Sequence, residues 1–242
     1  MSLIISARTL GDLAMPDFCP RCFWIKLKLE SKLPFQIPMP GIFSSIDSYV
    51  KNVVARYYEQ EQKLPVWFPY IGEVVKRENV PSWHKFQIVH PQTGGILRGT
   101  PDEVFQLQDS SYHIIDYKTA KLTTKQDELF PSYEVQLNAY AYIANRTFFS
   151  PVSTLTLIYF DPDTDFKSEP ALLTRSDSHL MLGFTPKVKH VEIKADSFIQ
   201  ELIHRANEIN EQDAPPLHTS GCENCQLLEN LIQVVTSPLP RF

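Results

Sequence analysis

Apolar residues recur every three or four positions along residues 44–62, which predicts an amphipathic helix. Its apolar stripe consists of Ile46, Tyr49, Val50, Val53, Val54, Tyr57 and Tyr58. Ser44 or Ser45 is placed to cap the start of this helix. Similar patterns predict two further helices, over 131–147 and over 196–212, and Asp196 is the expected cap of the last one.

Between these helices the pattern changes to short apolar runs bounded by turn residues, which is typical of strands. The expected strands cover residues 85–90, 95–108, 111–119, 152–162 and 190–195. The order is therefore one helix, three strands, a second helix, two strands and a third helix. This order predicts an α/β fold with a central mixed β-sheet flanked by helices.

Two opposite charges follow the apolar run "YHII" at the end of one expected strand. Because side chains alternate between the faces of a strand, Asp116 and Lys118 share one face. The preceding strand brings Asp102 to a similar level. Two carboxylates beside a lysine are suited to phosphodiester hydrolysis with Mg²⁺ or Mn²⁺. An ordinary ion pair at a sheet rim, contributing about 0.2–1 kcal/mol, is the alternative explanation of the same pattern.

Two polar side chains on the expected helix 131–147 add to this set. Gln136 and Tyr140 are four positions apart and so project from the same face. They lie beside the apolar stripe of the helix and not at its centre. A simple surface pair of glutamine and tyrosine is the alternative.

Three motifs, taken together, resemble those of the PD-(D/E)XK nuclease superfamily, and more closely those of its RecB-like branch. In chain order the motifs are Pro101-Asp102, Asp116-Tyr117-Lys118 and Gln136-Leu-Asn-Ala-Tyr140. The resemblance covers residues 41–211 and implies a restriction-endonuclease-like core. It also implies a metal-dependent DNA nuclease, with an exonuclease acting on single strands or ends as the expected type.

The resemblance assigns a role to each matching residue. Asp102 and Asp116 would bind Mg²⁺ or Mn²⁺, with the backbone carbonyl of Tyr117 as a further ligand. Lys118 would be the catalytic lysine. The glutamine and the tyrosine of the following helix would position the DNA strand or support the lysine.

One position departs from the pattern of the family. Many RecB-like nucleases carry a histidine on the first core helix, whereas here Ile46 is followed by Asp47. Asp47 is expected either to bind the metal or to act as an acid at the helix N-terminus beside the Ser44 cap. The departure keeps open a second function, that of a nucleic-acid-binding or assembly module that has little or no activity.

The chain has four cysteines, in two C-x-x-C pairs at opposite ends of the sequence: Cys19, Cys22, Cys222 and Cys225. Together they can form a tetrahedral set of four thiolates that joins the two ends of the domain, here called the cysteine clasp. Two unrelated reduced pairs, or one redox pair, are the alternative. CRISPR-associated adaptation exonucleases and AddB-type nucleases carry a [4Fe–4S] cluster in such a clasp, which favours that cofactor. Their usual division is one cysteine before the core and three after it, so the two-and-two division keeps Zn²⁺ open.

Composition adds few constraints. A length of 242 residues suits one domain over 1–242, with the core at about 41–211 and the clasp at 19–22 and 222–225. The formal net charge of −5 means that binding to DNA would require a local basic patch. No apolar run is long enough for a membrane span, and a cytoplasmic location is expected. Expected partners are DNA and a repair, recombination or CRISPR-adaptation complex. A metal-stabilised interaction domain without a nucleic-acid role is a third possibility.

Overall fold

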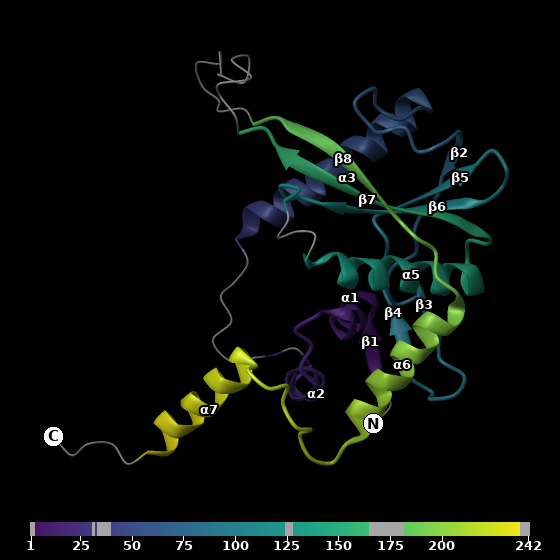
Figure 1. The fold of residues 1–242 in the computed structure, drawn as a ribbon. Coiled ribbons are helices and arrows are strands. Elements are labelled where there is room, and N and C mark those ends of the chain that lie inside the picture. The colour runs from purple at the N-terminus through teal and green to yellow at the C-terminus, as the bar shows by residue number, and fades with distance from the viewer. Residues whose placement is uncertain (1–2, 31, 33–39, 124–127, 165–181, 238–242) are drawn as a thin grey trace.

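A five-stranded mixed sheet lies at the centre of the fold (Figure 1). The computed structural model describes residues 3–30, 32, 40–123, 128–164 and 182–237. The strands of the sheet, in spatial order, are β2 (Val74–Arg77), β5 (Glu103–Leu107), β6 (Tyr112–Lys118), β7 (Val152–Pro162) and β8 (Phe184–Val191). β6 and β7 are parallel, and the other neighbours are antiparallel.

One helix covers each face of this sheet (Figure 1). α3 (Gly41–Glu61) packs Val50 and Val54 against Ile115 and Phe105 on one face. α5 (Phe130–Thr147) covers the other face and forms the crossover that joins the two parallel strands β6 and β7. The sequence motifs carried by β6 and α5 thus lie in the middle of the layered part of the fold.

A second layer packs on the outer side of α5 (Figure 1). It contains a three-stranded sheet in the order β1 (Ile4–Ser6), β4 (Ile96–Arg98) and β3 (Gln87–Val89). Its helical elements are α1 (Ala7–Gly11), the 3₁₀ turn η1 (Asp12–Ala14), α2 (Pro20–Lys28) and α6 (Asp196–Glu211). The last helix, α7 (Glu223–Thr236), packs against α2 and extends away from the rest of the fold.

The predicted α/β fold with a central mixed sheet flanked by helices is confirmed, while several boundaries differ. α3 begins at Gly41, three residues before the predicted start, with Pro40 as its N-cap. The Ser45 hydroxyl donates to the Gly41 carbonyl inside the helix, so neither predicted serine caps it. α6 does begin at the predicted residue, but its N-cap is Ala195, and the Asp196 carboxylate pairs with Arg146 of α5.

The single strand predicted over 95–108 is wrong, because the structure divides it into β4 and β5, which belong to different sheets. The interruption covers residues 99–102. A Cβ on Gly99 would lie 2.4 Å from the ring of Tyr140, so only glycine fits this close approach. Pro101 has no N–H to donate to a strand neighbour, which favours the end of a ladder at this point.

The strand predicted over 190–195 also differs, since β8 ends at Val191. The reason is a side chain of α5. The Asn138 amide donates to the carbonyl of Glu192, and its oxygen accepts from the backbone N–H of Lys194. These bonds satisfy the backbone groups that would otherwise continue the ladder.

A buried ion pair joins the edge strand β2 to β5. Arg77 donates two hydrogen bonds to the carboxylate of Glu103, at 2.7 and 3.1 Å. The Glu103 side chain is fully buried, and this burial raises the pKa of its carboxyl although Arg77 lowers it. Because the pair is bidentate and shielded from water, Arg77 compensates a charge that would be costly alone.

Among the helices in the described part of the chain, none has both the length and the apolar character that crossing a bilayer requires.

Candidate active site

Asp116 and Lys118 lie at the carboxyl end of β6 on the same face, as strand alternation predicts, and this face is the one towards α5. The ammonium of Lys118 is 2.6 Å from Asp116 Oδ2. Both side chains are largely shielded from solvent, and the Lys118 ammonium also lies 4.2 Å from the centre of the Tyr133 ring. The pair is therefore a partly buried cluster at the end of the sheet and not a solvated rim pair.

Asp102 lies beside this pair because the strand ladder ends next to it. The ladder between β5 and β6 includes the pair Glu103 and Ile115, and Pro101, two residues before Glu103, has no N–H. The backbone N–H of Tyr117 instead donates to Asp102 Oδ2 at 2.7 Å. The Asp102 carboxylate thus accepts the hydrogen bond that a carbonyl of a neighbouring strand would otherwise accept. This bond fixes Asp102 next to the backbone of the Asp116-Tyr117-Lys118 motif.

α5 contributes Gln136 and Tyr140, which are both buried. The Gln136 amide nitrogen donates to Asp116 Oδ1 at 3.3 Å and to the Tyr140 hydroxyl at 2.7 Å. Its oxygen accepts from the Lys118 ammonium at 3.3 Å. The two residues are therefore part of one network with the acid and the lysine, and a surface pair is excluded.

A residue of α3 that the sequence analysis did not select also enters the site. The ammonium of Lys51 lies 2.7 Å from Asp102 Oδ1 and 2.7 Å from Asp47 Oδ2. Burial alone would lower the pKa of Lys51, but the carboxylates of Asp102 and Asp47 outweigh it and raise the pKa. Lys51 therefore balances the charge of Asp102.

This lysine changes the interpretation of Asp47. α3 begins six residues before Asp47, so the acid does not lie in the first turn of the helix, where the helix dipole acts most strongly. Asp47 reaches Asp102 through Lys51, which binds both carboxylates. The prediction that Asp47 acts as an acid at the helix N-terminus is thus wrong, and its role as a metal ligand stays a prediction.

The electrostatics of the site favour a bound cation. Burial and the nearby carboxylate of Asp116 raise the pKa of Asp102 from its usual 3.8 to about 7, although Lys51 and the Tyr117 N–H lower it. Burial and the same Asp116 carboxylate also raise the pKa of Tyr140. A divalent ion that prefers oxygen ligands would favour the ionised form of Asp102 beside the carboxylate of Asp116.

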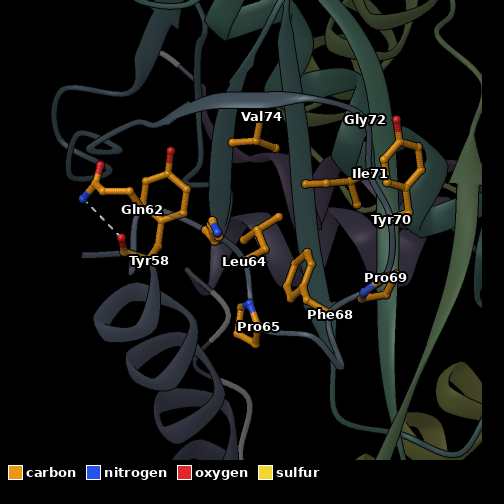
Figure 2. A pocket seen from close by; sticks show the side chains of 11 residues that line it. Tyr58, Gln62, Leu64, Pro65, Phe68, Pro69, Tyr70, Ile71, Gly72 and Val74 are labelled. Atoms are coloured by element: carbon orange, nitrogen blue, oxygen red, sulfur yellow. Dashed lines mark hydrogen bonds between the residues drawn. The ribbon is translucent and has the colours of Figure 1, made fainter. Parts of the chain in front are cut away.

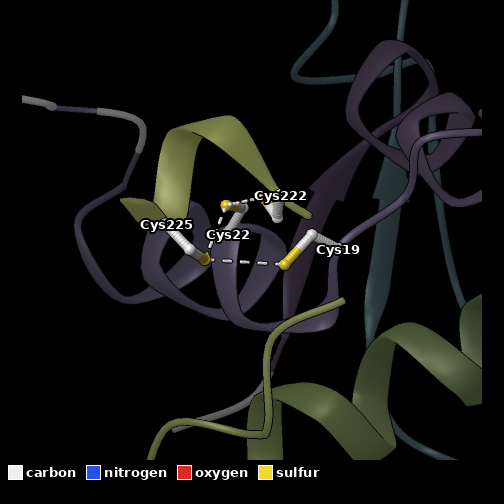
Figure 3. Close-up of side chains that lie close together, drawn as sticks. All are labelled: Cys19, Cys22, Cys222 and Cys225. Carbon is white, nitrogen blue, oxygen red and sulfur yellow. Dashed lines mark hydrogen bonds between the residues drawn. The ribbon is translucent and has the colours of Figure 1, made fainter. Parts of the chain in front are cut away.

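The four predicted cysteines also come together, as Figure 3 shows. One pair comes from the start of α2 and the other from the start of α7. Their sulfur atoms all lie within 4.8 Å of one another, and all four cysteines are free thiols. The cysteine clasp can therefore bind a metal, and the prediction that the four residues meet is confirmed.

Two pockets lie apart from both clusters. The first, of about 310 Å³, is formed where α3 ends and the chain turns back towards β2 (Figure 2). Tyr58, Phe68 and Ile71 are among its lining residues. The second, of about 540 Å³, lies between α3 and the ends of β7 and β8, beside Trp67 and Phe160. Neither is lined by a predicted site residue.

Two solved structures are distantly similar to this chain. SSO0001 is 13% identical with a TM-score of 0.48, covering 100% of this chain and 89% of that chain. LHK-Exo in complex with dAMP is 12% identical with a TM-score of 0.42, covering 96% of this chain and 94% of that chain. At these values neither similarity bears on function.

Among curated proteins, none matches the chain. The family model of the PD-(D/E)XK nuclease superfamily matches residues 42–229. This range includes α3 from its second residue, the central sheet, α5 and the start of α7. Because the match spans well over half of the sequence, the chain belongs to the PD-(D/E)XK nuclease superfamily.

Proposed function

We propose that this protein is a metal-dependent deoxyribonuclease of the RecB-like type. The observation that carries the proposal is the network at the end of β6. There Lys118 and Gln136 both contact Asp116, while Asp102 is bound to the next backbone amide. Within a nuclease superfamily, such a set of two acids and a lysine supports phosphodiester hydrolysis.

Mg²⁺ or Mn²⁺ is the expected metal, because the described residues of the site offer carboxylate oxygens, which these hard cations prefer. Asp102 and Asp116 would hold the ion, and the carbonyl of Tyr117 would be a third ligand. Asp47 is a further candidate ligand, and because the Lys51 ammonium contacts one oxygen of Asp102 and one of Asp47, it would move aside when the ion binds. When bound, the metal polarises the phosphate and lowers the pKa of a water molecule.

Lys118 is placed to orient the attacking water and to balance the negative charge that develops on the phosphate. Gln136 holds the lysine and Asp116 in one geometry, because it accepts from the first and donates to the second. The Tyr140 hydroxyl accepts a hydrogen bond from the Gln136 amide and so holds it in place. Because Gly99 has no side chain, there is room for the Tyr140 ring. Gln136 and Tyr140 are therefore assigned as positioning residues.

The expected substrate is DNA, with single strands or free ends preferred and exonuclease action as the expected mode. The glutamine and tyrosine on the helix after the Asp-x-Lys strand support the RecB-like assignment. We also propose that residues 1–242 act as one domain, in the cytoplasm, within a repair, recombination or CRISPR-adaptation complex.

A nuclease assay tests the proposal. End-labelled single- and double-stranded DNA is incubated with the protein and Mg²⁺ or Mn²⁺, with chelator as a blank. We expect cleavage that depends on the metal and is lost in Asp116→Asn, because this change removes a ligand charge while keeping the side-chain shape. Asp109→Asn, at an exposed acid of the β5–β6 turn, is the matched control and should cleave normally.

A second function has one observation in its favour. The Lys51 ammonium already neutralises Asp102, as it would in a site that binds nucleic acid without turnover. DNA binding by the wild-type protein, without cleavage in either metal, would establish this binding module and contradict the nuclease proposal.

The raised pKa of Asp102 predicts how stability depends on pH in the absence of metal. The folded chain holds this proton up to about pH 7, whereas an unfolded chain releases it near 3.8. Because the folded state binds more protons in this interval, stability falls as pH rises from about 4 to about 7. In urea unfolding with chelator, the free energy of unfolding of the wild-type protein should therefore decrease over this pH interval, whereas that of Asp102→Asn should not. Parallel curves for the two proteins would contradict the assignment.

A further inference from the structure

We propose that the cysteine clasp binds a single tetrahedral metal ion, Zn²⁺, and not the [4Fe–4S] cluster that the RecB-like resemblance favours. The clasp is remote in sequence from the carboxylates, and metal binding there does not depend on nuclease activity. The spacing of the sulfurs, the structure of the two C-x-x-C pairs and their surroundings all favour a single ion.

The sulfur spacing fits one ion. Sγ of Cys22 is 3.5 Å from that of Cys225 and 3.6 Å from that of Cys222, while Cys19 and Cys225 are 3.7 Å apart. Four sulfurs bound at about 2.3 Å around one Zn²⁺ at tetrahedral angles lie about 3.8 Å from each other. The observed distances are close to this value and far longer than the roughly 2 Å of a disulfide bond.

The same spacing does not fit a four-iron cluster. In such a cluster each cysteine binds a different iron atom, so the cluster itself separates the four sulfurs. Here all four sulfurs lie within 4.8 Å of one another around one point. Accepting a cluster would push the starts of α2 and α7 apart. Because Cys19 and Cys225 are buried, such a shift would also disturb the side chains that enclose them.

The two halves of the site have the same local structure. Cys19 is the N-cap of α2 and Cys222 is the N-cap of α7, and in each pair the second cysteine lies in the first turn of the helix. Backbone N–H groups at a helix start point towards these positions and stabilise thiolates. The N–H of Thr219 also lies 3.4 Å from the sulfur of Cys19. Two equivalent half-sites facing one centre are typical of a closed structural zinc site.

The surroundings show what the ion would stabilise. Along the described helix α7 only Cys225 is buried, while apolar residues such as Leu227 and Val234 are largely exposed. Besides the sulfurs, α7 is joined to α2 by an ion pair between Arg21 and Glu229 at 3.1 Å. Since an exposed ion pair contributes at most about 1 kcal/mol, the metal would be the main link between α7 and the rest of the fold.

Metal analysis of the full chain tests the proposal. The protein is produced in medium supplied with both iron and zinc and is purified without oxygen, so that a labile cluster would survive. We expect one zinc per chain, no acid-labile sulfide and no visible absorption band. Replacement by Co²⁺ should give the visible bands of a tetrahedral thiolate site. Iron and sulfide in the protein, or a folded chain free of metal, would overturn the proposal.

Cys222→Ser provides a second measurement, with Ser220→Ala, at an exposed neighbour, as the matched control. We expect Zn²⁺ to bind at least about 100-fold more weakly to the cysteine variant in chelator competition, because one of four ligands is lost. Limited proteolysis should then cut residues 212–222 sooner in this variant than in the control. Equal zinc affinity in the two variants would contradict the proposal. Because neither measurement uses DNA, an inactive active site would leave the result unchanged.

Discussion

Replacing Lys118 with methionine is expected to lower the rate of metal-dependent DNA cleavage by about a thousandfold. Methionine keeps most of the side-chain volume but removes the ammonium that contacts Asp116 and Gln136. The two carboxylates remain, so the metal should still bind. Single-turnover cleavage of end-labelled DNA measures the first effect, and titration with Mn²⁺ measures the second.

Lys121→Met is the matched control, because this lysine follows the same strand three residues later and is exposed. It should cleave at nearly the wild-type rate. If Lys118→Met retained wild-type cleavage, Lys118 could not be the catalytic lysine. If both variants lost DNA binding equally, the role of Lys118 would be that of a general phosphate contact.

Replacing Arg77 with methionine is expected to lower the free energy of unfolding by about 3–5 kcal/mol. The reason is the partner that remains: Glu103 is fully buried and would keep an uncompensated charge. Protonation of this carboxyl, whose pKa is already raised by burial, would recover part of the loss at low pH. Urea unfolding at neutral pH, followed by circular dichroism, measures the difference.

Lys76→Met tests whether the effect belongs to the buried pair. Lys76 is the adjacent residue in β2, and its side chain is 60% exposed in an ion pair with Glu78. This change should cost no more than about 1 kcal/mol. A double variant, Arg77→Met with Glu103→Leu, should recover much of the stability because it removes the unpaired charge. If Lys76→Met and Arg77→Met lowered the free energy of unfolding by similar amounts, the buried pair of Arg77 and Glu103 could not be the cause.

Those parts of the site that depend on strand and helix periodicity could be predicted from the sequence. Alternation in β6 correctly placed Asp116 and Lys118 together on one face, which the structure shows to be the face towards α5. Helical spacing correctly placed Gln136 and Tyr140 on one side of α5. In both cases the relevant neighbours are close in the chain, so a local rule fixes their relative positions.

The parts that were missed depend on contacts between distant segments. Lys51 had no signal of its own in an amphipathic helix, where an exposed lysine is ordinary, and only the packing of α3 brings it to Asp102. The role of Gly99 depends on the ring of Tyr140, which lies on a helix more than thirty residues later. The three-stranded sheet was missed for the same reason, because β1 pairs with β4 across most of the first hundred residues.

The cysteine clasp joins residues far apart in the sequence, since Cys19 and Cys225 are separated by 206 positions. Contacts of such long range form late, because the entropy of closing the loop between them is lost before any stabilisation is gained. On the ribosome the clasp cannot close until all of this stretch has been synthesised, because Cys225 is its last residue. For the proposed metal to bind, the first C-x-x-C pair must stay reduced while the central sheet forms, and metal uptake would be a late step in the maturation of the protein.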